Sequence, residues 1–189
     1  MVLDDALKDA RLLAAFIVER YGLDRDELLT FFSGSKGFHV GLPLSLCGTA
    51  PHPRPHSPAK KYRGEGRLSP SGDFNRVCRR LAEGLAGFSG VTIDTGVFDK
   101  VRLFRAPNSK HPKTGLRKRR LTSEELLGLK LDRIVQLAAE PLGFDLPDDP
   151  KPNEQAVLDW QEANENLRRS ALRQRSNVAN AQTRRARGG

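Results

Sequence analysis

The segment at residues 31–40, with the sequence FFSGSKGFHV, combines a glycine-containing turn with polar side chains that could bind an anion. Apolar residues on both sides predict two short strands, so the turn would close a β-hairpin. Such a turn exposes backbone N–H groups that suit an anion, and its two glycines, Gly34 and Gly37, allow a ligand to approach closely. Its polar side chains are Ser33, Lys36 and His39. Together they suit a triphosphate, although an ordinary hairpin turn with a solvated lysine and a packed histidine has the same pattern.

A second candidate region lies further along the chain. Asp94 follows the apolar residues 91–93, and the stretch from Lys100 to Arg120 holds nine lysines or arginines and no acidic residue. Each contact between such a cation and a phosphate would add a salt-dependent contribution to affinity for nucleic acid. Alternatively, Asp94 is a turn residue at the end of a strand, and the basic stretch is a solvated loop. Aromatic residues make up only 6% of the chain, so base stacking is not expected to be its main grip on a nucleic acid.

The residues Ser-Gly-Ser-Lys-Gly-Phe-His at positions 33–39 resemble the second motif of the archaeo-eukaryotic primase superfamily, which includes primase small subunits, primase-polymerases and bacterial repair polymerase domains. Residues 93–98 are similar to its third motif, a hydrophobic residue followed by a metal-binding aspartate. The resemblance covers roughly residues 5–140. It implies that Asp94 holds Mg²⁺ or Mn²⁺ and that Asp94 and His39 are catalytic. The nucleotide-binding residues that it implies are Ser33, Lys36, His39, Arg102, Arg105 and Lys110, with Arg105 favoured over Arg102.

By this resemblance the expected function is that of a DNA primase-polymerase type nucleotidyltransferase, which makes primers or extends chains on a template. The expected partners are nucleoside triphosphates, a DNA template or primer, and a helicase or another replication protein. The alternative is an inactive fragment, or a module that binds nucleotide or nucleic acid without turnover.

The chain departs from the superfamily at the first motif, a pair of aspartates one residue apart on a strand before the first helix. Asp4 and Asp5 are adjacent, so they would point to opposite faces of a strand. Asp24 and Asp26 have the required spacing but follow the helix in a turn-like stretch, where capping a short helix is the better interpretation. We therefore expect a core that is truncated before the first motif, and a chain that is inactive alone.

Hydrophobic periodicity predicts an α+β fold, with a small, mostly antiparallel sheet flanked by helices. Helices are expected over residues 3–21, 74–87 and 123–140, the last opened by a capping box of Thr122 and Glu125. Strands are expected at 28–32, 38–42, 91–93 and 101–104, with one more ending at residue 121. A flexible, proline-rich loop is expected at 43–72.

The predicted division places a partial catalytic core at residues 1–144 and a linker with a basic helix and tail at 145–189. Val157, Trp160, Ala163 and Leu167 form one face of that helix. From residue 166 onward there are seven arginines and no acidic residue, so the tail is expected to fray.

Composition narrows the class of protein. The 189 residues carry a net charge of +9, which favours polyanionic partners. No apolar run is long enough to span a bilayer, and we expect a cytoplasmic protein. Four residues, Cys47, His52, His56 and Cys78, could be taken for zinc ligands, but their spacing fits no common zinc finger, so zinc is not expected.

Overall fold

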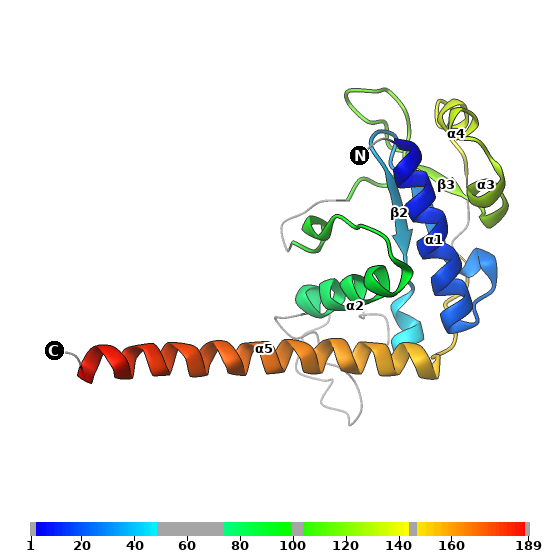
Figure 1. Cartoon of the computed structure of the whole chain (residues 1–189). Coiled ribbons are helices and arrows are strands. Elements are labelled where there is room, and N and C mark those ends of the chain that lie inside the picture. Colours follow the sequence, from blue (N-terminus) through cyan, green and yellow to red (C-terminus); the bar gives the residue numbers. More distant parts are fainter. Residues whose placement is uncertain (1–2, 49–73, 100–103, 144–146, 188–189) are drawn as a thin grey trace, which may run out of the picture.

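The computed structural model describes residues 3–48, 74–99, 104–143 and 147–187, without the side chains of 171–187. In these residues the sheet has three antiparallel strands in the order β2-β1-β3. The central strand β1 (Leu29–Phe32) pairs with β2 (Phe38–Gly41) and with β3 (Arg119–Leu121). Together with the surrounding helices (Figure 1), this sheet confirms the predicted α+β class and the predicted hairpin.

One face of the sheet is covered by α1 (Leu3–Tyr21), which lies along it in Figure 1. The helix forms because its apolar residues recur every three or four positions, and the buried ones, such as Leu7, Ala14 and Ile17, share one core with Phe32 of β1. The helix ends at Gly22, whose backbone φ of 59° is left-handed, as the sequence predicts for a helix C-terminus.

A second helical pair closes the other end of the core. Helix α2 (Phe74–Ser89) packs against α5 (Glu154–Arg187), whose residues Ala156, Trp160, Ala163 and Leu167 are buried in the same core as α1. The first part of the predicted C-terminal extension is therefore packed into the domain. Asp159 anchors it, since its carboxylate accepts hydrogen bonds from Arg20 at 2.6 and 2.7 Å and from the Tyr21 hydroxyl at 2.8 Å.

Beyond these contacts α5 projects away from the rest of the molecule (Figure 1). Its backbone is helical through Arg187, where the sequence had predicted fraying. The helix holds no glycine or proline between its ends, and alanine, arginine and glutamine favour helix. None of the described helices is apolar over a stretch long enough to cross a bilayer.

One expected strand is absent from the described residues. Residues 91–94 form no strand; the Val91 N–H bonds the carbonyl of Ala86 at 3.0 Å, and the chain continues into the 3-10 helix η4 (Thr95–Phe98). Asn75 of α2 donates to the carbonyl of Phe98 at 2.9 Å, so η4 packs on α2. The expected strand at 101–104 lies mostly outside the described residues.

Two further expectations are corrected. The first residues of the expected loop at 43–72 form a 3-10 helix, η2 (Leu44–Cys47), in which Leu46 and Cys47 are buried. Residues 49–73 lie outside the described part of the chain. The helix expected over 123–140 is two helices, α3 (Ser123–Gly128) and α4 (Leu131–Leu137). Its predicted capping box is confirmed. The break is held by Arg11 of α1, which donates to the carbonyls of Leu126 and Leu129 at 2.7 and 2.6 Å.

Candidate anion-binding site

The turn between β1 and β2 is held by Ser33. Its backbone N–H donates to the carbonyl of Gly37 at 2.9 Å, and its hydroxyl oxygen accepts from the N–H groups of Ser35 and Gly37 at 3.3 and 3.2 Å. Ser33 is itself buried. In this structure it therefore shapes the turn, and its expected contact with a phosphate stays a prediction.

A second hairpin-like loop, residues 106–118, docks on this turn. It is closed by hydrogen bonds from the Asn108 N–H to the Lys118 carbonyl at 2.8 Å and from the Lys118 N–H to the Ser109 carbonyl at 3.0 Å. The Thr114 hydroxyl donates to the Gly34 carbonyl at 2.6 Å. Gly34 has a φ of 78°, and a Cβ there would lie 2.9 Å from the carbonyl oxygen of Leu116. The turn and the loop lie side by side in Figure 1, and glycine is what allows this approach.

Strand alternation decides which side chains meet at this junction. Phe31 pairs with His39 and Phe32 with Phe38, so Phe31 and His39 share one face of the sheet while Phe32 and Phe38 share the other. Phe32 belongs to the core with α1. The opposite face, with Phe31 and His39, receives Lys118, whose ammonium lies 4.8 Å from the centroid of the Phe31 ring.

Three cationic or potentially cationic side chains gather on this face; we call Arg105, Lys118 and His39 the basic cluster. The Arg105 guanidinium donates to the carbonyl of Ser33, and the ammonium of Lys118 donates to the carbonyl of Arg105 at 3.0 Å. Lys118 is only 7% exposed. Two buried nitrogens of the cluster, Nη1 of Arg105 and Nδ1 of His39, have no hydrogen-bond partner among the described residues. Buried polar groups normally have one, so these atoms are suited to a ligand.

The charges of the basic cluster have no acidic partner among the residues that the structure describes. In the described part of the chain no ion pair joins Arg105 or Lys118 to a carboxylate. Burial, followed by the charges of Lys118 and Arg105, lowers the pKa of His39 to about 4. Burial and the neighbouring Arg105 also lower the pKa of Lys118. An anion would relieve this repulsion, because it favours the charged form of every member.

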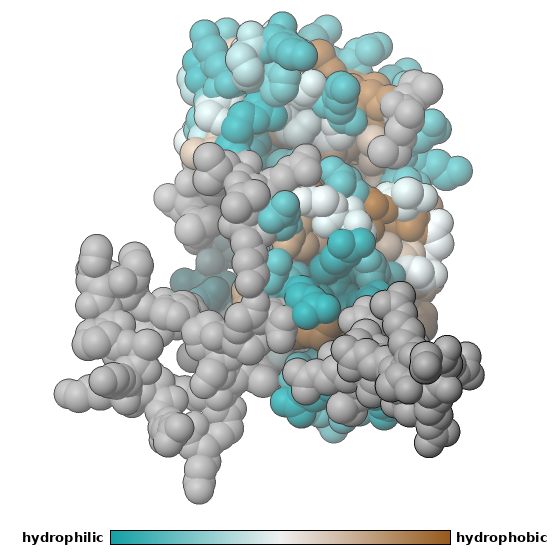
Figure 2. Space-filling view, turned by 90° about the vertical axis from the view of Figure 1, so that its left-hand side faces the viewer, coloured by the Kyte–Doolittle hydropathy of each residue, from teal (hydrophilic) through white to brown (hydrophobic). Residues whose placement is uncertain are grey.

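The outer rim of the junction carries more positive charge. The pKa of His111 is lowered by loss of solvation and then by the charges of Arg105, Lys113 and Lys36. Figure 2 shows mainly hydrophilic residues at the upper end of this side of the molecule, where the loop 106–118 lies.

The other predicted site residues are placed differently. Lys110 is exposed, and its backbone forms an isolated antiparallel β-bridge with Arg117 across the loop. Arg102 lies outside the described residues. Asp94 is exposed and caps η4, where its Oδ1 accepts from the N–H of Gly96 at 2.9 Å. The described residues contain no group of three or more histidine, cysteine, aspartate or glutamate side chains able to hold a metal ion. They do not by themselves fit a Mg²⁺ or Mn²⁺ centre, and the role of Asp94 as a metal ligand stays a prediction.

Sequence reasoning missed Lys118, His111 and Lys113 as members of the site. All three belong to the basic stretch already noted, but composition cannot tell a buried lysine from a solvated one. A usable signal was alternation: Lys118 is two residues before Arg120, which pairs with Phe31, so both positions face the same side of the sheet.

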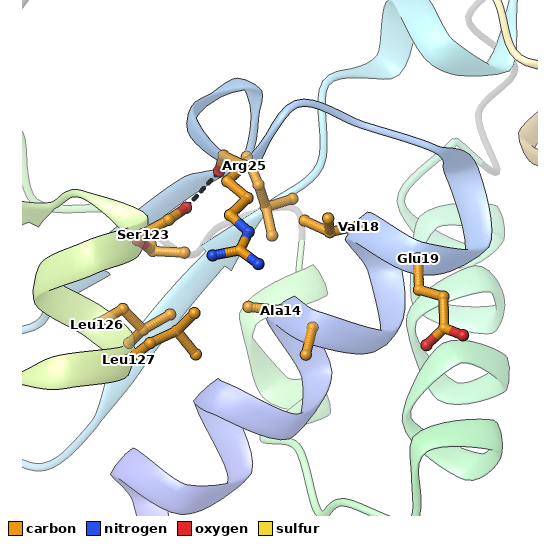
Figure 3. A pocket seen from close by; sticks show the side chains of 10 residues that line it. Ala14, Val18, Glu19, Arg25, Ser123, Leu126 and Leu127 are labelled. Atoms are coloured by element: carbon orange, nitrogen blue, oxygen red, sulfur yellow. Dashed lines mark hydrogen bonds between the residues drawn. The ribbon is translucent and has the colours of Figure 1, made fainter.

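A hollow of about 220 Å³ lies elsewhere, between α1, β1 and α3. Figure 3 shows its mainly apolar lining, with Ala14 and Val18 from α1 facing Leu126 and Leu127 from α3. Thr30 also lines it, and Thr30 alternates with Phe31 along β1, so the hollow lies on the opposite face of the sheet from the basic cluster. It offers no group of cations for a phosphate.

The fold and the site define an α+β protein with a cluster of cationic side chains at a glycine turn. Comparison with known proteins finds relatives over part of the chain. Over 112 residues, 58% of this chain, it is 33% identical to the DNA primase small subunit PriS of Saccharolobus islandicus strains L.S.2.15 and M.14.25. The chain spans about a third of the length of these relatives, since the match covers 33% of each. No family model and no solved structure matches it.

Proposed function

We propose that this chain carries the triphosphate-binding part of a primase-polymerase type nucleotidyltransferase. The observation that carries the proposal is the basic cluster, in which Lys118, Arg105 and His39 converge beside a glycine turn. Two of its buried nitrogens find no partner in the described part of the chain. Two lines of evidence support it. The turn has the sequence expected of the superfamily's second motif, and the chain resembles proteins named DNA primase small subunit.

The described residues would act by binding and charge stabilisation. Arg105 and Lys118 would neutralise phosphate oxygens, and His39, which is uncharged near pH 7 because of its low pKa, would donate one hydrogen bond. Lys36 and His111 at the rim would hold the outer phosphates. Phosphoryl transfer depends mostly on positioning and on electrostatic stabilisation, so such a cluster could orient the α-phosphate for in-line attack by a 3′-hydroxyl. Mg²⁺ or Mn²⁺ held through Asp94 belongs to this proposal.

A DNA template or primer is the second proposed ligand. The part of α5 that projects from the domain, residues 168–187, carries seven arginines and no acid. Contacts of arginine with backbone phosphates give affinity without sequence preference, and this affinity falls steeply as salt rises. A helicase or another replication protein remains a proposed partner.

The decisive experiment measures binding of inorganic tripolyphosphate and of a nucleoside triphosphate to the full chain by calorimetry. Lys118→Met should weaken both by about tenfold or more, because a hydrogen bond to a charged group contributes about 1.5–3 kcal/mol. Lys8→Met, which removes an exposed lysine of α1, is the matched control and should change nothing. Equal binding by wild type and Lys118→Met, or no binding by wild type, would refute the proposal.

A binding module without turnover is the second candidate function. It is favoured by the lack of a carboxylate cluster among the described residues. Primer synthesis in the presence of Mn²⁺ distinguishes the two candidates, and we expect none from this chain alone. Synthesis that is lost in His39→Ala would instead assign the enzyme activity to the chain itself.

A further inference from the structure

Phe104 is a large apolar side chain that the fold leaves in solvent. It is 57% exposed and stands directly beside the basic cluster. Its ring meets His39 edge to face, with the centroids 5.6 Å apart and the planes at 84°, and the ammonium of Lys118 lies 5.8 Å from its centroid. Two members of the cluster therefore hold the ring in place while more than half of the residue remains uncovered.

The other strongly exposed phenylalanine has a local explanation. Phe88 is 67% exposed, but its ring stacks with Phe16 at 6.4 Å and lies 5.1 Å from the guanidinium of Arg20. That group belongs to the α1–α2 contact and includes no member of the basic cluster. Phe104 differs because its neighbours are the groups proposed to bind phosphate.

A cationic cluster and an exposed aromatic face are the two surfaces that a nucleotide needs. The phosphates require the cations, and the base, which is flat and apolar on its faces, stacks on an aromatic ring. The ring of Phe104 lies directly beside both His39 and Lys118. A nucleotide whose phosphates contact these cations would bring its sugar and base to the adjoining ring.

We propose that Phe104 is the stacking surface for the base of the nucleotide whose phosphates occupy the basic cluster. The inference rests on the proposed function and adds a base contact to it. A phenyl face has no donor or acceptor, so all four bases should bind, with any preference set by stacking strength.

The experiment compares two probes on the full chain: a nucleoside triphosphate, which has a base, and inorganic tripolyphosphate, which has none. Removing a stacking ring should weaken binding of a base-containing ligand by about fivefold to a hundredfold. Phe104→Ala should therefore lose affinity for the nucleoside triphosphate but keep the wild-type affinity for tripolyphosphate. Phe104→Trp should retain both affinities, and Phe88→Ala is the control for loss of an exposed ring.

Phe104→Trp adds a direct optical readout. The single natural tryptophan, Trp160, is buried at 3% exposure in the contact of α5 with the core, away from solvent quenchers. Emission from the introduced indole should be quenched by the nucleoside triphosphate and not by tripolyphosphate.

The outcomes separate this inference from the proposed function. Unchanged nucleotide affinity in Phe104→Ala would overturn the stacking role while leaving the phosphate site intact. Equal loss for both probes would also overturn it, because the ring would then act only by holding the cluster in place. No binding of tripolyphosphate by wild type would remove the proposed function itself, and the stacking role with it.

Discussion

Replacing Gly34 with alanine should separate the turn from the loop that docks on it. An alanine in the left-handed conformation observed, with φ at 78°, costs about 1–2 kcal/mol. In addition, its Cβ would lie 2.9 Å from the Leu116 carbonyl oxygen and 3.0 Å from that of Arg117. Both atoms are backbone, so the loop itself must move, and overpacking of this kind costs about 1–3 kcal/mol more.

Gly22 offers a matched control for the conformational part of this cost. Its φ is 59°, and a Cβ there would meet nothing within 4 Å. Gly22→Ala should therefore lower the free energy of unfolding by only about 1–2 kcal/mol. The extra loss in the free energy of unfolding of Gly34→Ala, compared with that of Gly22→Ala, then measures the steric contact between the turn and the loop.

The assay is urea unfolding of both variants, followed by calorimetry with tripolyphosphate. Gly34→Ala should unfold more easily than Gly22→Ala by at least about 1 kcal/mol. It should also bind tripolyphosphate about tenfold or more weakly, because a displaced loop moves Lys118 away from Arg105. If the two variants are equally stable and bind equally well, the loop does not dock on the turn and the reasoning fails.

Two other predictions concern groups whose surroundings the structure makes explicit. The pKa of His39 is about 4 in the folded chain and about 6.5 when unfolded, so the unfolded state binds more protons between these two pH values. The free energy of unfolding should therefore fall as the pH is lowered from 6.5 to 4, by roughly 2 kcal/mol after allowance for partial exposure. His39→Gln should flatten this pH dependence in urea titrations, and an unchanged dependence would contradict the reasoning. Asp159→Asn should lower the free energy of unfolding by about 3 kcal/mol, because Arg20 then loses the negative charge that balances it at 2.6 Å. Its tripolyphosphate affinity should stay at the wild-type value. A loss of stability below about 1 kcal/mol would show that the pair does not anchor α5.

Local signals in the sequence predicted the elements that depend on neighbours a few residues away. The periodicity of α1, its end at Gly22, the β1–β2 hairpin and the capping box of Thr122 are confirmed. Each arises from hydrogen bonds or backbone preferences within one or two turns of chain, which residue type and spacing encode directly.

Elements that depend on distant partners were predicted less well. Residues 91–93 have the composition of a strand, but the chain there leads from α2 into η4, which packs back on α2. The break between α3 and α4 is held by Arg11 of the distant helix α1. In both cases a tertiary contact overrides the local pattern. Likewise, the sequence placed Trp160 on an apolar helix face but did not predict its contact with Phe74 of α2.

Residue types and spacing alone were therefore enough to predict the class of fold and the glycine turn with Ser33, Lys36 and His39. Which cations join that turn depends on long-range packing in the folded chain. It buries Lys118 against Phe31 and directs Arg105 to the carbonyl of Ser33, whereas Lys110 stays exposed on the loop. All three belong to one basic stretch and look alike in sequence. Burial and pairing separate them, and both are set by segments that meet only when the chain folds.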